Sequence, residues 1–513
     1  MRVPNRKPLR LTLDEARGIM LAAQGLWRIP AESATGNARK NEIPAESATA
    51  SIADSEIPAE SATGNASEYQ ISAESATVFP PRLAGERPGV RLSKNEIPAE
   101  SATLASVRAE IERLGVVQVD TISVVARSQY LVLWSRLGPY DPTLLDALHS
   151  PHRGIFEYWS HAASIVPMSD YPYYRADMLR AAEVHLWDPL RDWMRENAAV
   201  IEETRAAIRT RGPLASADFE RDPSAARANP WDWYGPKESR KALDVLWTLG
   251  ELMISSRRGG QKVYDLRERV LKEALGKVPR DSRLPSPPEQ RDHFTRRTIQ
   301  ALGILTPAWL WDYFRLHDYV ITAGSNGHKP TKRAAAEATL AALASKKKLL
   351  PVEIDGLQGP AYLDPSRLAD LEWLRAGERP ARTTLLSPFD NLIWHRQRAR
   401  DLFGYEVCFE AYVLPEKRRY GYYCLAILHQ GRLVGRLDPK FVRAERGLLV
   451  RSVHLEPGEP VDGALLVGLA GTLRELAAFL GAETIVVERS DPPELTPMLA
   501  EHLALDPPSE RFN

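Results

Sequence analysis

Apolar residues near the start of the chain recur at helical spacing. Thr12 and Glu15 occupy the two positions of a capping box, and apolar side chains follow at helical intervals. Residues 104–114 show the same spacing and end at Gly115, the residue type favoured as a left-handed helix cap. We therefore predict two helices, the second of which leads directly into a short β-branched run at residues 116–122.

The β-branched run carries two polar residues, Gln118 and Asp120, separated by one valine. Side chains two positions apart on a strand share a face, so the amide and the carboxylate would point the same way while Val117 and Val119 pack inward. The pattern predicts a paired polar site on an apolar support. An ordinary strand with one solvent-facing side has the same alternation, so spacing alone leaves both interpretations open.

A helix followed by a two-stranded hairpin is predicted twice further along the chain. After a long charged helix at residues 187–211, the first copy has a helix at 237–249 and two strands at 252–264 around Gly259-Gly260. The second copy has helical patterns at residues 291–302 and 331–344, a helix start at Thr306-Pro307, and strands at 346–354 and 360–363. This layout is typical of a DNA-binding winged helix, although basic hairpin tips are also ordinary solvated turns. The candidate DNA-binding residues here are Lys237, Arg240, Lys241, Arg257, Arg258 and Lys262.

The last third of the chain is rich in short predicted strands. They span residues 405–414, 420–429, 432–438, 448–453 and 484–488, and such spacing suggests a small barrel or sandwich. Basic residues interleave with tyrosines here, which favours a phosphate-backbone partner over a merely solubilising surface. The candidates are Lys417, Arg418, Arg419 and Arg436. Residues 461–480 are apolar but include Arg474 and Glu475, so we interpret them as a buried helix and predict no membrane segment.

A repeated segment interrupts the two N-terminal helices. Ile29-Pro-Ala-Glu-Ser-Ala-Thr35 recurs in nearly the same form at Ile43, Ile57 and Ile71, every 14 residues, and a fifth copy starts at Ile97. Each copy offers a single large apolar residue, too little to offset the entropy of ordering it. We interpret residues 28–103 as a low-complexity insertion that is mostly disordered, with residues 78–94 as a remnant of an original loop.

Composition limits the class of protein. A chain of 513 residues with 44% apolar content suggests three or four domains, and two cysteines exclude a disulfide scaffold or a four-ligand zinc site. The chain is expected in the reducing cytosol. Its net charge of zero argues against a nucleic-acid binder, but residues 28–103 hold 7 Lys or Arg and 11 Asp or Glu, so the remainder is net positive.

Residues 156–167 combine aromatic side chains with a histidine. Tyr158, Trp159 and His161 are candidates for lining a functional site. A packed core with one hydrogen-bonded histidine is the interpretation that the pattern favours.

Five separated motifs resemble the winged-helix family that includes the AlkZ and YcaQ crosslink-repair DNA glycosylases. They are Leu114-Gly-Val-Val-Gln-Val-Asp-Thr-Ile122, Phe156-Glu-Tyr-Trp-Ser-His-Ala162, Gly250-Glu-Leu-Met-Ile254 with Tyr264-Asp-Leu266, Leu386-Ser-Pro-Phe-Asp-Asn-Leu392, and Lys417-Arg-Arg-Tyr-Gly-Tyr-Tyr423 with Leu433-Val-Gly-Arg-Leu-Asp438. The resemblance covers essentially everything outside residues 28–103.

The resemblance implies an α+β fold of tandem winged-helix domains followed by a small β-barrel-like C-terminal domain. We expect a first winged-helix domain from residues 1–27 and 104–170, two more at 171–285 and 286–378, and the barrel-like, DNA-contacting domain at 379–513. It also implies a monofunctional DNA glycosylase that removes N7-alkylated purines and unhooks interstrand crosslinks. The expected partner is double-stranded DNA with alkylated or crosslinked purines. We expect a cytoplasmic, nucleoid-associated monomer without a membrane partner.

The family's catalytic motif is glutamine, an aliphatic residue, then glutamine or aspartate, and Gln118 and Asp120 match the aspartate version found in the YcaQ branch. We therefore expect a broader crosslink and alkylpurine activity than the self-resistance specificity of the glutamine branch. An N7-alkylated guanine is already cationic, so positive charge develops on the sugar as the glycosidic bond breaks. Asp120 would stabilise that charge and accept a proton from water, and Gln118 would orient the water. No metal or other cofactor is expected.

Two other functions compete with this one. A non-enzymatic winged-helix transcriptional regulator or DNA-structure binder would share the layout, but such regulators commonly dimerise and no heptad or compact dimerisation segment stands out. A helix-hairpin-helix glycosylase is a weaker alternative, because its Gly-rich hairpin with a following lysine or aspartate is not found.

Overall fold

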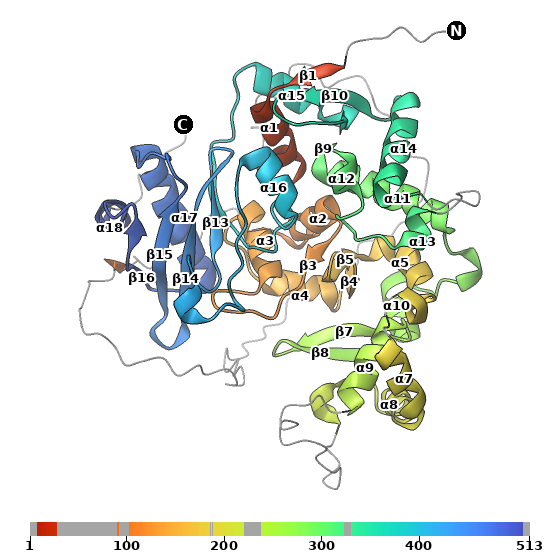
Figure 1. The fold of residues 1–513 in the computed structure, drawn as a ribbon. Coiled ribbons are helices and arrows are strands. Elements are labelled where there is room, and N and C mark those ends of the chain that lie inside the picture. The colour runs from red at the N-terminus through yellow and green to blue at the C-terminus, as the bar shows by residue number, and fades with distance from the viewer. Residues whose placement is uncertain are drawn as a thin grey trace, which may run out of the picture. The chain divides into compact units, whose positions relative to one another are not determined.

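The computed structural model describes residues 8–27, 90–91, 102–184, 186, 188–219, 238–322 and 330–505 (Figure 1). Three small sheets and one seven-stranded sheet run through these residues. The expectation that residues 28–103 are disordered lies outside the described residues, apart from 90–91 and 102–103. Within that segment Val90 and Arg91 form β2, which pairs antiparallel with the C-terminal β16 (Thr484–Val487).

The first small sheet carries the Gln-Val-Asp segment. Its elements are α2 (Leu104–Leu114), β3 (Val117–Gln118), α3 (Ser128–Leu137), α4 (Thr143–His149), β4 (Ile155–Trp159) and β5 (Ala163–Pro167). The predicted cap at Gly115 is confirmed, with a φ of 71° that only glycine adopts without cost. The strands are antiparallel in the order β3-β5-β4, so β3 is an edge strand that begins immediately after the capped helix.

The second small sheet contains the basic hairpin. Its segment comprises α5 (Tyr171–Met178), α6 (Ala181–Val184), α7 (Asp188–Glu196), α8 (Ala198–Arg211), β6 (Leu214–Ala215), α9 (Glu238–Thr248), β7 (Leu252–Arg258), β8 (Gln261–Leu266) and α10 (Arg267–Leu275). The predicted hairpin around Gly259 and Gly260 is confirmed, and both glycines have positive φ angles. The single long helix predicted at residues 187–211 is instead two helices that meet at Asn197, whose φ of −113° departs from helical geometry.

The third small sheet brings the N-terminus together with a distant segment. It belongs with β1 (Leu9–Leu11), α1 (Leu13–Ala23), α11 (Pro287–Leu302), β9 (Ile304–Leu305), α12 (Pro307–Leu310), α13 (Asp318–Ile321), α14 (Lys332–Ser345), β10 (Leu350–Ile354), β11 (Ala361–Leu363) and α15 (Leu368–Arg375). The order is β1-β10-β11-β9, and β1 is parallel to β10. Residues 8–27 were expected with residues 104–170. In the structure their backbone pairing and the packing of α1 against α15 join them to the third sheet (Figure 1).

The C-terminal sheet is open, which corrects the expectation of a barrel-like domain. Its elements are β12 (Thr383–Leu386), α16 (Arg396–Phe403), β13 (Leu425–His429), β14 (Arg432–Val442), β15 (Gly447–Leu455), α17 (Gly463–Leu480), β16, β17 (Ser490–Asp491) and α18 (Leu495–Ala504). Strands β12 and β2 end the path β12-β13-β14-β15-β16-β2. The strand expected at residues 405–414 is absent. The carboxylate of Glu410 there accepts the backbone amides of residues 419–421 at 2.9, 2.8 and 3.2 Å, in an irregular loop.

Helix α17 packs against this sheet and against α18 (Figure 1). Among the described residues it alone has the length and apolar composition of a membrane span. Its leucines Leu465, Leu469, Leu473 and Leu476 are buried in the same core as the sheet residues Leu437 and Val450. It is therefore a core helix, as the sequence predicted.

Candidate active site

Gln118 lies at the end of strand β3, and its side-chain amide makes no hydrogen bond to the described residues. Its backbone pairs with Ser164 of β5, and the Val119 amide extends the pairing by donating to the Ala163 carbonyl at 2.8 Å. Val117 is fully buried and Gln118 is half-buried. In the described part of the chain the Gln118 amide makes no hydrogen bond, which leaves its donors and acceptor available to a water molecule.

Asp120 lies beyond the strand, in a turn that fixes its carboxylate. One carboxylate oxygen, Oδ1, accepts a hydrogen bond from the Ile122 amide at 2.7 Å. Among the residues described, the second oxygen has no hydrogen-bond partner. Because the regular strand ends at Gln118, the shared strand face predicted for the two polar residues does not extend to Asp120.

The environment of Asp120 raises the pKa of its carboxyl group. Partial burial is the largest cause, and it is opposed by the hydrogen bond from the Ile122 amide and by the positive charge of Arg127. A raised pKa makes the ionised carboxylate a better proton acceptor. Sequence reasoning did not single out Arg127, although a cation seven residues after the acid was visible as a signal.

The loop after Asp120 is held from two sides. The Phe441 amide at the end of β14 donates to the Val124 carbonyl at 2.9 Å, and the Arg443 guanidinium donates to the Ser123 carbonyl at 3.2 Å. From the hairpin side, Arg127 donates to the Gly260 carbonyl at 3.3 Å. The hairpin β7–β8 and the C-terminal sheet, both predicted to be basic, therefore meet the loop that carries the candidate catalytic acid.

Three buried hydroxyl groups form a chain at the far end of this loop. The Oγ atoms of Ser128 and Ser387 are 2.8 Å apart, and the Ser387 Oγ is 3.0 Å from the Tyr423 hydroxyl. Burial raises the pKa of Tyr423, the hydrogen bond to Ser387 lowers it, and the nearby negative charge of Asp120 raises it again. The chain thus connects the start of α3, the segment after β12 and the residues just before β13.

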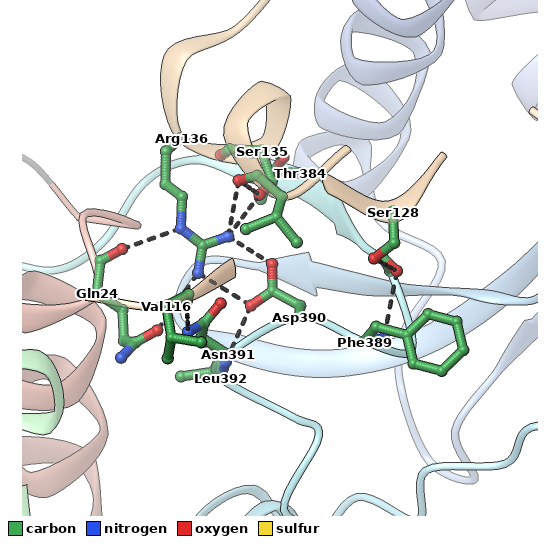
Figure 2. Close-up of polar contacts among 12 residues, drawn as sticks. Gln24, Val116, Ser128, Ser135, Arg136, Thr384, Phe389, Asp390, Asn391 and Leu392 are labelled. Atoms are coloured by element: carbon green, nitrogen blue, oxygen red, sulfur yellow. Dashed lines mark hydrogen bonds and ion pairs between the residues drawn. The ribbon is translucent and has the colours of Figure 1, made fainter. Parts of the chain in front are cut away.

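A fully buried ion pair between Arg136 and Asp390 joins α3 to the segment that follows β12 (Figure 2). The guanidinium of Arg136 in α3 contacts both carboxylate oxygens of Asp390, with an Nη2–Oδ1 distance of 2.9 Å, and donates through Nε to the Gln24 carbonyl at 3.1 Å. The neighbouring Asn391 amide donates to the Val116 carbonyl at 2.8 Å, just before β3. The motif at residues 386–392 therefore supports strand β3, which carries the candidate residue Gln118, from the C-terminal sheet. The sequence of the motif did not reveal this role.

Tyr158, Trp159 and His161 make packing contacts rather than an exposed cluster. The Tyr158 hydroxyl donates to the Thr248 carbonyl at 2.6 Å, and the Trp159 indole N–H donates to the Thr248 hydroxyl at 3.1 Å. The His161 Nδ1 donates to the Asp312 carbonyl at 3.0 Å, and the ring stacks on Trp394 at 3.9 Å. Burial lowers the pKa of His161 to about 4. These contacts fit the packed-core interpretation, and Trp159 alone of the three is substantially exposed, at 36%.

The basic candidates of α9 and the β7–β8 hairpin differ in whether an acidic or aromatic side chain already contacts them. Arg257 makes two hydrogen bonds to buried Glu157, at 2.7 and 2.5 Å, and Arg258 pairs with Asp218 at 2.9 Å. The ammonium of Lys262 lies 4.1 Å from the Trp247 ring centroid, and that of Lys241 lies 4.5 Å from Trp193. Arg240 is exposed, and Lys237 lies outside the described residues.

The basic candidates of the C-terminal segment divide into surface and buried side chains. Lys417 and Arg419 are exposed, and Arg419 lies 4.7 Å from the Tyr420 ring centroid. Arg418 donates to the Val413 carbonyl at 2.8 Å. Arg436 is only 2% exposed, donates to the Glu406 carbonyl at 2.9 Å and pairs with Glu456, a geometry that supports a structural role instead of a phosphate contact.

Comparison with known proteins gives the family. A family model described as DNA glycosylase AlkZ-like matches residues 111–480, which include Gln118, Asp120 and Asp390. The solved structure of Streptomyces sahachiroi DNA glycosylase AlkZ is similar with a TM-score of 0.46 and 17% identity, covering 75% of this chain and 93% of that chain. Because the family match alone extends over more than half of the sequence, the protein belongs to the AlkZ-like DNA glycosylase family.

Proposed function

We propose that this protein hydrolyses the N-glycosidic bond of N7-alkylated purines in duplex DNA and unhooks interstrand crosslinks formed through such purines. The single observation that carries the proposal is the paired site at residues 118–120. A half-buried carboxylate at Asp120 is held by the Ile122 amide with its second oxygen free of described partners, two residues after the unpartnered amide of Gln118, inside the segment that matches the family.

The chemistry follows from what each group offers. N7 alkylation makes the purine a cationic leaving group, so the bond breaks without a strong general acid and positive charge grows on the sugar. The Asp120 carboxylate stabilises that charge and takes the proton of the attacking water, and Gln118 orients the water. Residues 114–130 contain no lysine, which favours simple base release over a lyase reaction.

The arrangement of the small sheets supports duplex binding. Each of the three follows helices and includes an antiparallel strand pair, the layout expected of tandem winged-helix units, and the exposed Arg240, Lys417 and Arg419 offer charge to the phosphate backbone. We include the tandem winged-helix organisation in the proposal.

The test is base release from a duplex that carries a single N7-methylguanine or an N7-linked crosslink. Wild-type protein should produce abasic sites, and Asp120→Asn should lower the single-turnover rate by about a hundredfold or more, the usual range for losing a positioned acid–base group. Asp141→Asn, an exposed carboxylate in the same segment, is the matched control and should keep the wild-type rate. Tight binding without base release by the wild type would favour the non-enzymatic regulator, and equal rates for both variants would remove Asp120 from the mechanism.

A further inference from the structure

Arg315 is an exposed arginine in a strained backbone conformation. It lies between α12 and α13 and has a φ of 47°. This left-handed region costs free energy for any residue with a Cβ, so glycine and asparagine are the residues that usually occupy it. Residues held in such conformations gather at ligand-binding sites. The turn alone therefore does not explain an arginine at this position.

Hydrogen bonds fix the Arg315 turn against the first small sheet. The Tyr313 hydroxyl donates to the Leu114 carbonyl, shortly before β3, at 2.9 Å. The Asp312 carbonyl accepts the Arg315 amide at 3.2 Å and the Nδ1–H of the His161 ring at 3.0 Å. The turn is therefore anchored both ahead of β3 and at the turn between β4 and β5, where His161 lies.

The β4–β5 turn brings Arg315 near the candidate catalytic residues. The Ala163 carbonyl, two residues after His161, accepts the Val119 amide at 2.8 Å. Val119 is the residue between the two members of the paired polar site. Since the Arg315 guanidinium contacts His161, this charge is held close to the end of β3.

The neutral ring of His161 is a hydrogen-bond acceptor for Arg315. A carbonyl oxygen only accepts, so the ring hydrogen is on Nδ1, facing Asp312, and Nε2 keeps its lone pair. The Arg315 Nη2 lies 3.4 Å from that Nε2. Burial lowers the pKa of His161 to about 4, although the Asp312 carboxylate acts in the opposite direction. The ring also stacks on Trp394 with centroids 3.9 Å apart, so the acceptor is rigidly placed.

The charge of Arg315 has no acidic partner among the described residues. A groove of about 620 Å³ opens beside it, with His317 and Lys332 also in the lining. His317 lies 3.5 Å from the Asp177 carboxylate, and Lys332 lies 2.9 Å from that of Asp318. Of the described cations in this lining, Arg315 is thus the one left for an external anion. Its guanidinium offers a phosphate two parallel donors.

We propose that Arg315 binds a backbone phosphate of the DNA strand next to the lesion and that His161 positions the guanidinium. The assignment of the neighbouring lesion rests on the proposed function. A neutral acceptor suits this role, because a carboxylate in its place would neutralise the charge and compete with the phosphate. A guanidinium that is already oriented also loses less side-chain entropy when DNA binds. His161 is therefore a positioning residue that does not itself touch DNA.

The first test is a scan of single, neutral methylphosphonate linkages through a duplex that contains N7-methyl-2′-fluoro-deoxyguanosine. The fluorine withdraws electrons from the sugar and prevents base release, so fluorescence anisotropy measures binding alone. The wild type should lose about tenfold in affinity at one linkage, the size of a hydrogen bond between charged groups. Arg315→Gln should show no loss there. Arg333→Gln is the matched control, because that exposed arginine already pairs with Glu337 at 3.0 Å, and it should behave as the wild type does.

The second test uses the same duplex with ordinary phosphates. Arg315→Gln should weaken binding about tenfold and reduce the slope of log affinity against log salt by about 0.9, the value for one phosphate contact. His161→Phe keeps a ring against Trp394 but removes the acceptor, so it should weaken binding about fivefold. His161→Gln keeps an acceptor and should bind as the wild type does. A double variant, Arg315→Gln with His161→Phe, should bind as Arg315→Gln does, because the two residues act through one contact.

The outcomes separate the parts of the proposal. Equal losses in the wild type and Arg315→Gln at every linkage would overturn the phosphate assignment. Losses that multiply in the double variant, or a His161→Gln variant as weak as His161→Phe, would overturn the positioning role. If the scan identifies the Arg315 linkage but the wild type releases no base from an ordinary N7-methylguanine duplex, the phosphate contact stands and the glycosylase proposal fails. If base is released but no linkage depends on Arg315, the reverse holds.

Discussion

Removing one partner of the Arg136–Asp390 ion pair should destabilise the fold severely. Both side chains are fully buried, and Asp390 also accepts the Leu392 amide at 2.9 Å. Asp390→Ala leaves a guanidinium uncompensated in the interior, which costs about 3–5 kcal/mol, far more than an exposed pair contributes. Arg432 and Glu459 provide the matched control, because they form the same two-bond geometry at 3.1 and 2.7 Å with the arginine half exposed. Glu459→Ala should cost about 0–1 kcal/mol.

Urea unfolding followed by tryptophan fluorescence measures both variants against the wild type. A double variant, Arg136→Met with Asp390→Leu, tests the cause, because it removes both charges and should recover most of the stability lost by Asp390→Ala. Equal midpoints for Asp390→Ala and Glu459→Ala would refute the reasoning from burial. A double variant as unstable as the single one would show that packing, and not an unpaired charge, is responsible.

Three further predictions concern the site and its surroundings. Gly260→Ala places a Cβ 2.2 Å from the Arg127 Nη2 and should reduce base release several-fold, whereas Gly259→Ala has the same positive-φ strain with nothing within 4 Å and should not, as a single-turnover assay would show. Arg127→Gln removes a charge that lowers the pKa of Asp120, so the acidic limb of the pH–rate profile should move to higher pH; an unchanged limb would contradict this assignment. The pKa of His161 is about 4 in the folded state and near 6.5 in the unfolded state, so the free energy of unfolding falls as the pH drops through that window. Between pH 7 and 5, His161→Phe should therefore lose about 2 kcal/mol less unfolding free energy than the wild type does, as urea titrations at both pH values would show.

Local signals in the sequence predicted local structure well. The capping box at Thr12, the glycine cap at Gly115 and the hairpin at Gly259-Gly260 depend on neighbours only a few residues apart, and each is confirmed. The pairing of β1 with β10 and that of β2 with β16 depend on partners hundreds of residues away, which no local pattern encodes.

The same division applies to the site. Gln118 and Asp120 were visible as a motif, but the turn that directs Asp120 depends on an amide two residues later and on a short strand that ends early. Arg127 and Asn391 matter because the fold brings Gly260 and Val116 to them. The burial of Arg436 likewise became apparent only with the packing of Tyr405 and Tyr420 around it.

The long sequence distance between Arg136 and Asp390 has a consequence for biosynthesis. The two residues are 254 positions apart, and β1 pairs with a strand still further from it in the sequence. At the usual 5–20 residues per second, the ribosome needs about 10–50 s to deliver Asp390 after Arg136 has been made. During that interval the nascent segment that carries Gln118 and Asp120 lacks the carboxylate that neutralises its buried arginine. A fragment that ends before residue 380 should therefore be aggregation-prone, so the segment that carries the candidate catalytic residues depends on translation of the C-terminal sheet for its stability.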